Sequence, residues 1–136
     1  MLHTLIVEDD FTSRKILHAL MAPFGSCDIA VNGTEALGAF QAALRSDEPY
    51  QLIFLDITMP GMNGHQVLAE LRAMEAAHGI QGLDRARVIM ATGSSDPKDV
   101  RAAFHSECDA YLVKPIQKPK LMEQLKALGL LELMFR

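Results

Sequence analysis

The stretch QLIFLDITMPGMNG, residues 51–64, decides the fold of this chain. Its apolar run, Leu52–Leu55, is continuous and does not alternate with polar residues, which is typical of a strand buried on both faces of a parallel sheet. The run ends in one carboxylate, Asp56, and the segment Pro60–Gly64 then breaks the chain with proline, glycine and asparagine. We therefore expect Asp56 at the C-terminal end of a strand, the edge at which open α/β sheets bind ligands.

The rest of the chain alternates between predicted strands and predicted helices. Four further strands are expected at Leu2–Val7, Cys27–Val31, Val88–Ala91 and Ala110–Val113. Apolar residues recur at helical spacing over 16–24, 37–44, 67–74, 100–104 and 121–128, with Thr34 and Asp96 as expected N-caps and Pro97 in the first turn of the fourth helix. Five strands alternating with five helices predict an α/β fold, a doubly wound parallel sheet with helices on both faces.

Composition narrows the functional classes. A chain of 136 residues is expected to form a single domain, residues 1–136, without an output domain. The net charge of −4 does not favour nucleic-acid binding, and no apolar run reaches the length of a membrane span. Cys27 and Cys108 lack metal-binding or redox spacing, so we interpret them as reduced core residues, which predicts a cytoplasmic setting.

Polar residues end four of the five predicted strands. Asp9 and Asp10 follow the first strand, Asp56 ends the third, Thr92 the fourth and Lys114 the fifth. Because the ends of parallel strands meet at one edge, these side chains are expected to converge. Singly, each has a simpler interpretation: Asp10 as a helix cap, Thr92 as a loop hydroxyl, Lys114 as a solvated surface residue.

Clustered carboxylates repel one another unless a cation lies between them, and hard oxygen ligands favour Mg²⁺, for which Mn²⁺ is expected to substitute. An ammonium and a hydroxyl beside the metal supply what phosphoryl oxygens need. A carboxylate can also act as nucleophile and form an acyl phosphate. Asp56, on the central strand, is the candidate nucleophile.

The chain resembles the receiver domains of two-component response regulators from Leu5 to about Leu128. The motifs that carry the resemblance are LIVEDD (5–10), AVNGTEAL (30–37), LIFLDITMPGMNG (52–64), VIMATG (88–93) and AYLVKP (110–115). Each motif is weak alone, but their joint order and spacing are specific. The resemblance implies a flavodoxin-like fold with strand order 2-1-3-4-5 and the role of a bacterial phospho-acceptor signalling module.

The resemblance also implies residue roles. Asp56 would be the phospho-acceptor, and Asp10, Asp56 and the backbone carbonyl of Thr58 would ligate Mg²⁺ directly, with Asp9 acting through water. Lys114 would contact the phosphoryl group and precede a cis peptide bond to Pro115. Glu8 is interpreted as an electrostatic neighbour of the acidic pair.

Signalling would depend on a switch pair, Thr92 and Tyr111. Attraction of the Thr92 hydroxyl to the phosphoryl group would let Tyr111 rotate inward and reshape the face made by the fourth helix, fifth strand and fifth helix. Thr58 and Ser94 occupy the variable positions that tune dephosphorylation. Gly93 departs from the commoner alanine, which leaves room beside the phosphate.

The tail 129–136 is unusually apolar. We expect it to extend the last helix and pack back on the domain; the alternative is a dimer or partner surface. Expected partners are a sensor histidine kinase or histidine phosphotransfer protein, docking around Thr12–Leu20 and the loop after the fifth strand, and a downstream protein. A homodimer through the switch face is a further possibility, and no direct nucleic-acid or membrane partner is expected.

Three other functions remain as alternatives. A phosphatase resembling the haloacid dehalogenases would need a second acid two residues after the nucleophile, where this chain has Thr58. An FMN-binding module would need a phosphate loop after the first strand, where this chain has Glu8, Asp9 and Asp10. A receiver fold used purely as an interaction domain is the third reading. The chemistry expected is self-catalysed phosphoryl transfer, so the chain is not predicted to be an enzyme in the ordinary sense.

Overall fold

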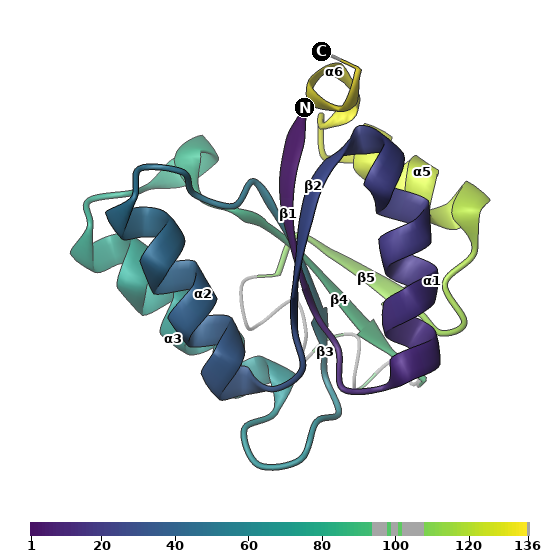
Figure 1. Ribbon diagram of the computed structural model, residues 1–136, viewed down its shortest axis with the longest axis horizontal. Coiled ribbons are helices and arrows are strands. Elements are labelled where there is room, and N and C mark those ends of the chain that lie inside the picture. Colours follow the sequence, from purple (N-terminus) through teal and green to yellow (C-terminus); the bar gives the residue numbers. More distant parts are fainter. Residues whose placement is uncertain (94–97, 99–100, 102–107, 136) are drawn as a thin grey trace.

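The computed structural model describes residues 1–93, 98, 101 and 108–135, and within them five strands form one parallel sheet (Figure 1). The strands are β1 (Leu2–Val7), β2 (Gly25–Ala30), β3 (Leu52–Asp56), β4 (Arg87–Thr92) and β5 (Ala110–Val113). Their order in the sheet is β2-β1-β3-β4-β5, which confirms the predicted topology. The predicted fourth helix and Ser94 lie outside the described residues.

Helices cover both faces of the sheet. The described helices are α1 (Phe11–Met21), α2 (Gly33–Arg45), α3 (Gly64–Ala77), α5 (Lys118–Ala127) and α6 (Leu131–Met134), with short 3₁₀ turns at Ala22–Phe24 and Gly82–Asp84. Figure 1 shows α2 and α3 on one face and α1 and α5 on the other. In the described part of the chain, no helix combines the length and the apolar character that a membrane span needs.

Side-chain caps begin three of these helices. The Asp10 carboxylate accepts from the Ser13 amide at 2.8 Å at the start of α1. The predicted cap at Thr34 is wrong, because the Asn32 side chain caps α2 two residues earlier. Asn63 and Gln66 form a capping box that starts α3 directly after the Asp56 loop. The chain therefore enters α1 and α3 at defined positions beside the strand ends.

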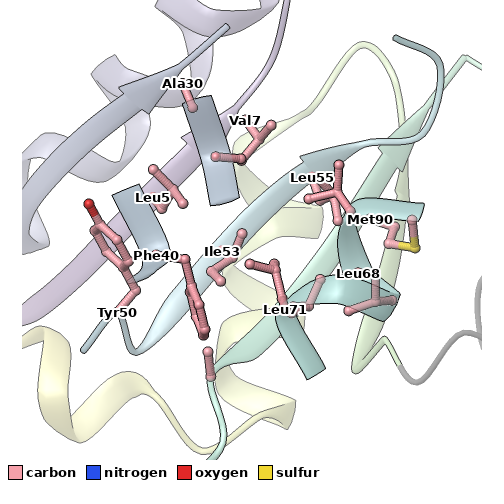
Figure 2. Packing of buried hydrophobic residues seen from close by; sticks show 14 of the residues in the cluster. Leu5, Val7, Ala30, Phe40, Tyr50, Ile53, Leu55, Leu68, Leu71 and Met90 are labelled. Atoms are coloured by element: carbon pink, nitrogen blue, oxygen red, sulfur yellow. The ribbon is translucent and has the colours of Figure 1, made fainter. Parts of the chain in front are cut away.

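Alternate residues of the buried strands supply two separate cores. Ile53 and Leu55 of β3 face the core beneath α2 and α3, which is drawn in Figure 2. Leu52 and Phe54 face the core beneath α1 and α5. The continuous apolar run of β3 thus serves both layers, as expected of a strand covered on both sides.

The C-terminal tail packs against the second core. Leu130 and Met134 are buried there, and the Phe135 ring meets Phe24 edge-on at 5.7 Å between centroids. The tail does not extend α5, because Gly129 has a φ of +75° and α6 begins only at Leu131. Figure 1 places this tail near the N-terminus, at the end of the sheet away from the loops that follow β1 and β3.

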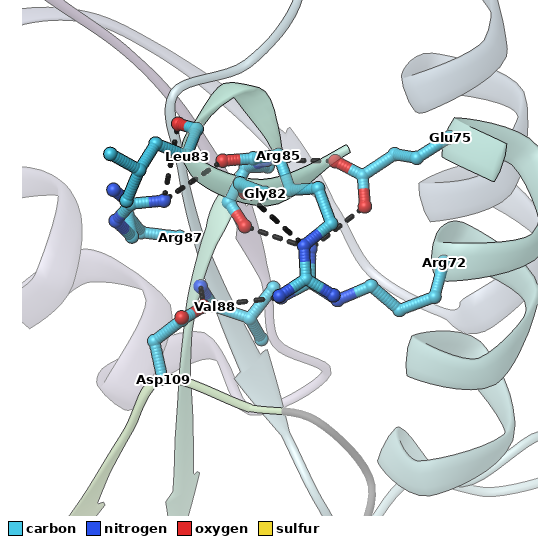
Figure 3. A network of polar contacts seen from close by, with 9 residues as sticks. Arg72, Glu75, Gly82, Leu83, Arg85, Arg87, Val88 and Asp109 are labelled. Atoms are coloured by element: carbon cyan, nitrogen blue, oxygen red, sulfur yellow. Dashed lines mark hydrogen bonds and ion pairs between the residues drawn. The ribbon is translucent and has the colours of Figure 1, made fainter. Parts of the chain in front are cut away.

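A partly buried ion network ties α3 to the start of β4 and to Asp109, the residue before β5 (Figure 3). The Arg72 guanidinium donates to Glu75 at 2.8 Å, to the Ala86 carbonyl at 2.9 Å and to Asp109 at 3.1 Å. Glu75 also accepts from the Ala86 amide at 2.7 Å, and Asp109 from the Val88 amide at 2.8 Å. The two carboxylates therefore bind the backbone at the start of β4, at Ala86 just before it and Val88 within it, while Arg72 neutralises their charge.

Gly64 lets α3 approach the end of β3. A Cβ atom at this position would lie 2.6 Å from the Asp56 carbonyl oxygen and 2.8 Å from the Ile57 Cα. Both are backbone atoms, which cannot move aside as a flexible side chain would. The absence of a side chain at Gly64 is therefore what allows the start of α3 to lie against the Asp56 backbone.

Gly64→Ala is expected to destabilise the protein by about 1–3 kcal/mol, the usual cost of overpacking a filled site. Gly38→Ala is the matched control, since Gly38 lies within α2 with open space around its Cβ position. There alanine should stabilise by about 0.5–1 kcal/mol through helix propensity. Urea unfolding of the three proteins tests this, and equal effects at the two glycines would contradict the close approach.

Arg72→Met is expected to destabilise by about 3–5 kcal/mol, because it leaves the buried Glu75 carboxylate without its counter-charge. Arg87→Met is the control: Arg87 donates to the carbonyls of Leu83 and Arg85, and its loss should cost about 1 kcal/mol. Urea unfolding measures both changes. A cost for Arg72→Met no larger than that of the control would show that the network contributes little.

Candidate functional site

The register of the sheet brings the ends of β1 and β3 together. Val7 pairs with Leu55, so the next residues along each strand, Glu8 and Asp56, lie level with each other. In the strand order β2-β1-β3-β4-β5, this junction of β1 and β3 is the point at which successive connections leave on opposite faces. Backbone geometry alone therefore directs two carboxylates to the edge where such folds bind ligands.

Three carboxylates form a cluster at this edge. One oxygen each of Glu8, Asp9 and Asp56 lies within 4.8 Å of the others. Glu8 and Asp56 are buried, with 1% and 5% of their surface exposed, whereas Asp9 is exposed. The cluster is thus open to solvent on the Asp9 side and closed by protein on the other.

Lys114 provides the positive charge in the cluster. Its ammonium contacts Glu8 Oε1 and lies 3.5 Å from Asp56 Oδ1. Burial and the neighbouring Glu8 carboxyl raise the pKa of Asp56 above its ordinary range, while Lys114 and the Thr58 amide act against this. Burial disfavours the charge on Lys114, but its contacts with Glu8 and Asp56 raise its pKa overall. One ammonium therefore offsets the two buried carboxylates incompletely.

Asp10 lies outside the cluster, so the structure does not bring this predicted direct metal ligand together with Asp9 and Asp56. Its exposed carboxylate caps α1, and the hydrogen bond from the Ser13 amide lowers its pKa. Glu8 takes the predicted place of Asp10 beside Asp56. The physical reason is the register: β1 ends at Val7, so the first side chain past the strand on the Asp56 side belongs to Glu8, and Asp10 already starts the helix.

The backbone around Asp56 fixes the direction of its side chain. Asp56 Oδ1 accepts from the Thr58 amide at 3.1 Å, and the Ile57 amide donates to the Ala91 carbonyl at 3.0 Å. Gly64 donates from its amide to the Ile57 carbonyl at 2.9 Å. The Thr58 side chain is exposed beside this site. The carboxylate is consequently held toward Lys114 while the loop beyond it stays open to solvent.

The remaining predicted residues lie on β4 and β5. Thr92 is buried at the end of β4, and its carbonyl accepts from the Lys114 amide at 2.7 Å. Tyr111 pairs with Met90 in the sheet and packs, half-buried, on the core beneath α2 and α3. The Lys114–Pro115 peptide bond is cis, and Gly93 has open space around its Cβ position.

The cluster has the donor chemistry of a Mg²⁺ site. Its donors are carboxylate oxygens, the ligands that Mg²⁺ prefers, and they come from two adjacent strand ends at a distance that one ion can bridge. Lys114 balances the buried charge only in part, so a divalent cation at the exposed side would relieve the repulsion between the carboxylates. The residues present therefore fit the metal, with Glu8, Asp9 and Asp56 as the acidic ligands.

Sequence reasoning missed two parts of this site. Glu8 is not assigned to the acidic pair from the sequence, because the register of β1 with β3 that places it level with Asp56 appears only in the structure. Arg14 carried no signal in the pattern of helix α1, yet its guanidinium donates to the carbonyls of Glu8 and Asp9. Contacts of a side chain with a loop backbone leave little trace in a single sequence.

Comparison with known proteins agrees with this geometry. The model of the response regulator receiver domain matches residues 4–126. The regulatory protein VanRB of Enterococcus faecalis is 34% identical over 125 residues, which are 91% of this chain and 50% of VanRB. The chain thus spans half the length of that protein.

Solved receiver domains superpose on the fold. The receiver domain of Ssk1 from Saccharomyces cerevisiae, crystallised with the phosphotransfer protein Ypd1, is 26% identical with a TM-score of 0.80, over 96% of this chain and 90% of that one. The receiver domain of the histidine kinase CKI1 from Arabidopsis thaliana, in complex with Mg²⁺, is 25% identical with a TM-score of 0.77, over 90% of each chain.

Asp9 lies in the carboxylate cluster and Asp10 lies outside it, so substitutions that remove the same charge at these two positions should differ in their effect on Mg²⁺ binding. Asp9→Asn should weaken Mg²⁺ binding by about tenfold or more, because it removes a carboxylate from the cluster. Asp10→Asn should change the affinity less than about threefold, since asparagine also caps helices and Asp10 lies outside the cluster. Isothermal titration with Mg²⁺ measures both, and a larger loss at position 10 than at position 9 would restore the original assignment.

Proposed function

Because the chain belongs to the response regulator receiver domain family, we propose that Asp56 accepts a phosphoryl group from a phosphohistidine on a partner protein. The observation that carries this proposal is the position of Asp56 beside Glu8, Asp9 and Lys114 at the end of the central strand. A nucleophilic carboxylate there has an ammonium on one side and a set of metal ligands on the other. Such a site provides the positive charge that stabilises a phosphoryl group during its transfer.

In the proposed transfer, an Asp56 oxygen forms a bond to phosphorus as the phosphorus–nitrogen bond to the donor imidazole breaks and its nitrogen takes up a proton. Lys114 neutralises charge on the phosphoryl oxygens, and the Thr58 amide holds Asp56 Oδ1 in place. Glu8, Asp9 and Asp56, with the predicted help of the Thr58 carbonyl, would hold Mg²⁺, which would supply further positive charge. Because Asp9 and Thr58 are exposed, the donor can approach from their side.

The proposed response to phosphorylation starts at Thr92 and Lys114. The Lys114 ammonium is shared between Glu8 and Asp56, so a dianion on Asp56 would draw it away from Glu8. The Thr92 hydroxyl, buried at the end of β4, is proposed to be drawn toward the phosphoryl group. Tyr111, half-buried on β5, is the proposed second member of the switch. The phosphoryl group shifts this equilibrium only by the difference in its interactions with the two states.

The proposed docking surface for the phosphodonor lies along α1. Ile16 is 38% exposed and lines a groove together with Thr12, Ser13, Lys114, Pro115 and Ile116. Phe11, the first residue of the same helix, is 63% exposed. Large exposed apolar side chains at the rim of a site are typical of a contact surface. This surface joins α1 to the loop after β5, as the sequence predicted for a histidine kinase or phosphotransfer partner.

The family is a signalling module, and the proposed chemistry is transfer to the chain itself followed by its own dephosphorylation, with Thr58 and Ser94 tuning the rate. The phosphoryl group is carried by the chain itself before it is hydrolysed, so we propose a signalling module and not an enzyme in the ordinary sense. The free thiols of Cys27 and Cys108 fit a reducing compartment, so a cytoplasmic location is part of the proposal.

Mass spectrometry of the intact protein tests the function after incubation with a small acyl-phosphate donor, with and without Mg²⁺. The wild type should gain one phosphoryl group in a Mg²⁺-dependent reaction, and Asp56→Asn should gain none. Reduction with borohydride followed by peptide mapping should place homoserine at position 56, because the reagent reduces an acyl phosphate to the alcohol. Equal labelling of wild type and Asp56→Asn would refute the assignment.

Lys114→Ala should lower the rate of phosphorylation by about 100-fold or more, as loss of a group that stabilises transition-state charge does. Lys118→Ala is the control, because Lys118 is an exposed lysine in the first turn of α5 and should leave the rate unchanged. Urea unfolding of each variant separates a loss of chemistry from a loss of fold. A normal rate in Lys114→Ala would contradict the role of this ammonium.

A further inference from the structure

The Arg14 side chain reaches back from α1 to the loop that carries the acidic cluster. Its Nη1 atom donates to the Glu8 carbonyl at 3.2 Å and to the Asp9 carbonyl at 3.3 Å. These two carbonyls belong to the residues whose carboxylates lie beside Asp56. One guanidinium nitrogen therefore bridges the backbone of both neighbouring ligand residues.

The loop is otherwise anchored at its two ends. The Glu8 amide donates to the Ala30 carbonyl at 3.0 Å, which fixes the start of the loop to β2. The Asp10 side chain caps α1, which fixes its end. The paired register of β1 with its neighbours stops at Val7, and Asp9 is exposed, so core packing does not set the direction of the Asp9 carboxylate. Across this middle section, the Asp10 amide donates to the Glu8 carboxylate at 3.5 Å, and Arg14 contacts the carbonyls of both Glu8 and Asp9.

We propose that Arg14 is a positioning residue of the Mg²⁺ site, one that holds the Glu8–Asp9 backbone so that both carboxylates face Asp56. This inference rests on the proposed function, because it takes the acidic cluster to be the metal site. Groups that orient metal ligands from outside the coordination sphere commonly contribute tenfold or more to metal affinity. Arg14 would act on the metal through the loop and without touching it.

A purely electrostatic effect of Arg14 has the opposite sign. A guanidinium near a cation site repels the cation, so removing the charge would strengthen Mg²⁺ binding. Removing a contact that positions the ligands would weaken it. The direction of the change in affinity therefore separates the two roles, without any assumption about its size.

Lys15 supplies a matched control. Its ammonium lies 5.5 Å from the centre of the Phe11 ring, and the Arg14 guanidinium carbon lies 5.6 Å from the same ring. The two residues thus share a charge, a helix and an aromatic neighbour. The contact with the carbonyls of Glu8 and Asp9 distinguishes them.

Isothermal titration of the wild type, Arg14→Ala and Lys15→Ala with Mg²⁺ tests the inference. We expect Arg14→Ala to weaken Mg²⁺ binding by about tenfold. Lys15→Ala should leave the affinity unchanged or slightly stronger. In the metal-free proteins, hydrogen exchange of the amides of residues 8–10 should accelerate in Arg14→Ala and match the wild type in Lys15→Ala.

Unchanged or tighter Mg²⁺ binding by Arg14→Ala, with a wild type that binds Mg²⁺, would overturn the role of Arg14 and leave the proposed function standing. A wild type that binds no Mg²⁺ would overturn the metal site and, with it, this inference. Should Arg14→Ala prove unfolded by urea titration, Arg14→Met makes the same comparison. Methionine keeps an apolar side chain on α1 but cannot donate to the carbonyls of Glu8 and Asp9, so weaker binding supports positioning and wild-type binding refutes it.

Discussion

The repulsion between the buried carboxylates of Glu8 and Asp56 is the constraint on which the rest of this structure depends. The register of β1 with β3 places them side by side, and burial makes their charge costly. Lys114 reaches both from the end of β5, so strands at the centre and the edge of the sheet meet in one ion cluster. A change in the charge of Asp56 is therefore expected to alter the contacts of Glu8 and Lys114 first.

The surrounding structure encloses the cluster at Glu8 and Asp56 and leaves it open to solvent at Asp9. Gly64 and the capping box of Asn63 start α3 against the Asp56 backbone. Farther along the same helix, Arg72 binds the Ala86 carbonyl before β4 and the Asp109 carboxylate before β5. The exposed Asp9 and Thr58 lie toward solvent. A phosphoryl group arriving there meets preorganised charges and does not have to assemble them.

Hydrophobic pattern predicted the strands well, because buried parallel strands such as Leu52–Asp56 are apolar without interruption and end where polar residues begin. It did less well at helix starts, where Asn32 and not Thr34 caps α2, since several neighbouring residues were chemically suitable. The sequence predicts the site as a set of strand ends. Placing Glu8 instead of Asp10 beside Asp56 requires the pairing register of β1 with β3, which only the structure shows. The contacts of Arg14 with the site cannot be predicted from the sequence, because its partners there are the backbone carbonyls of Glu8 and Asp9.

The central claim is that the Asp56 carboxylate lies in a cluster whose charge Lys114 balances only in part and Mg²⁺ binding balances further. Urea unfolding of the wild type and Asp56→Asn, each with and without Mg²⁺, tests it most directly. We predict that metal-free Asp56→Asn is more stable than the metal-free wild type, and that Mg²⁺ at about 100 times its Kd stabilises the wild type by about 2.7 kcal/mol but not the variant. A less stable Asp56→Asn that keeps the full stabilisation by Mg²⁺ would contradict the account.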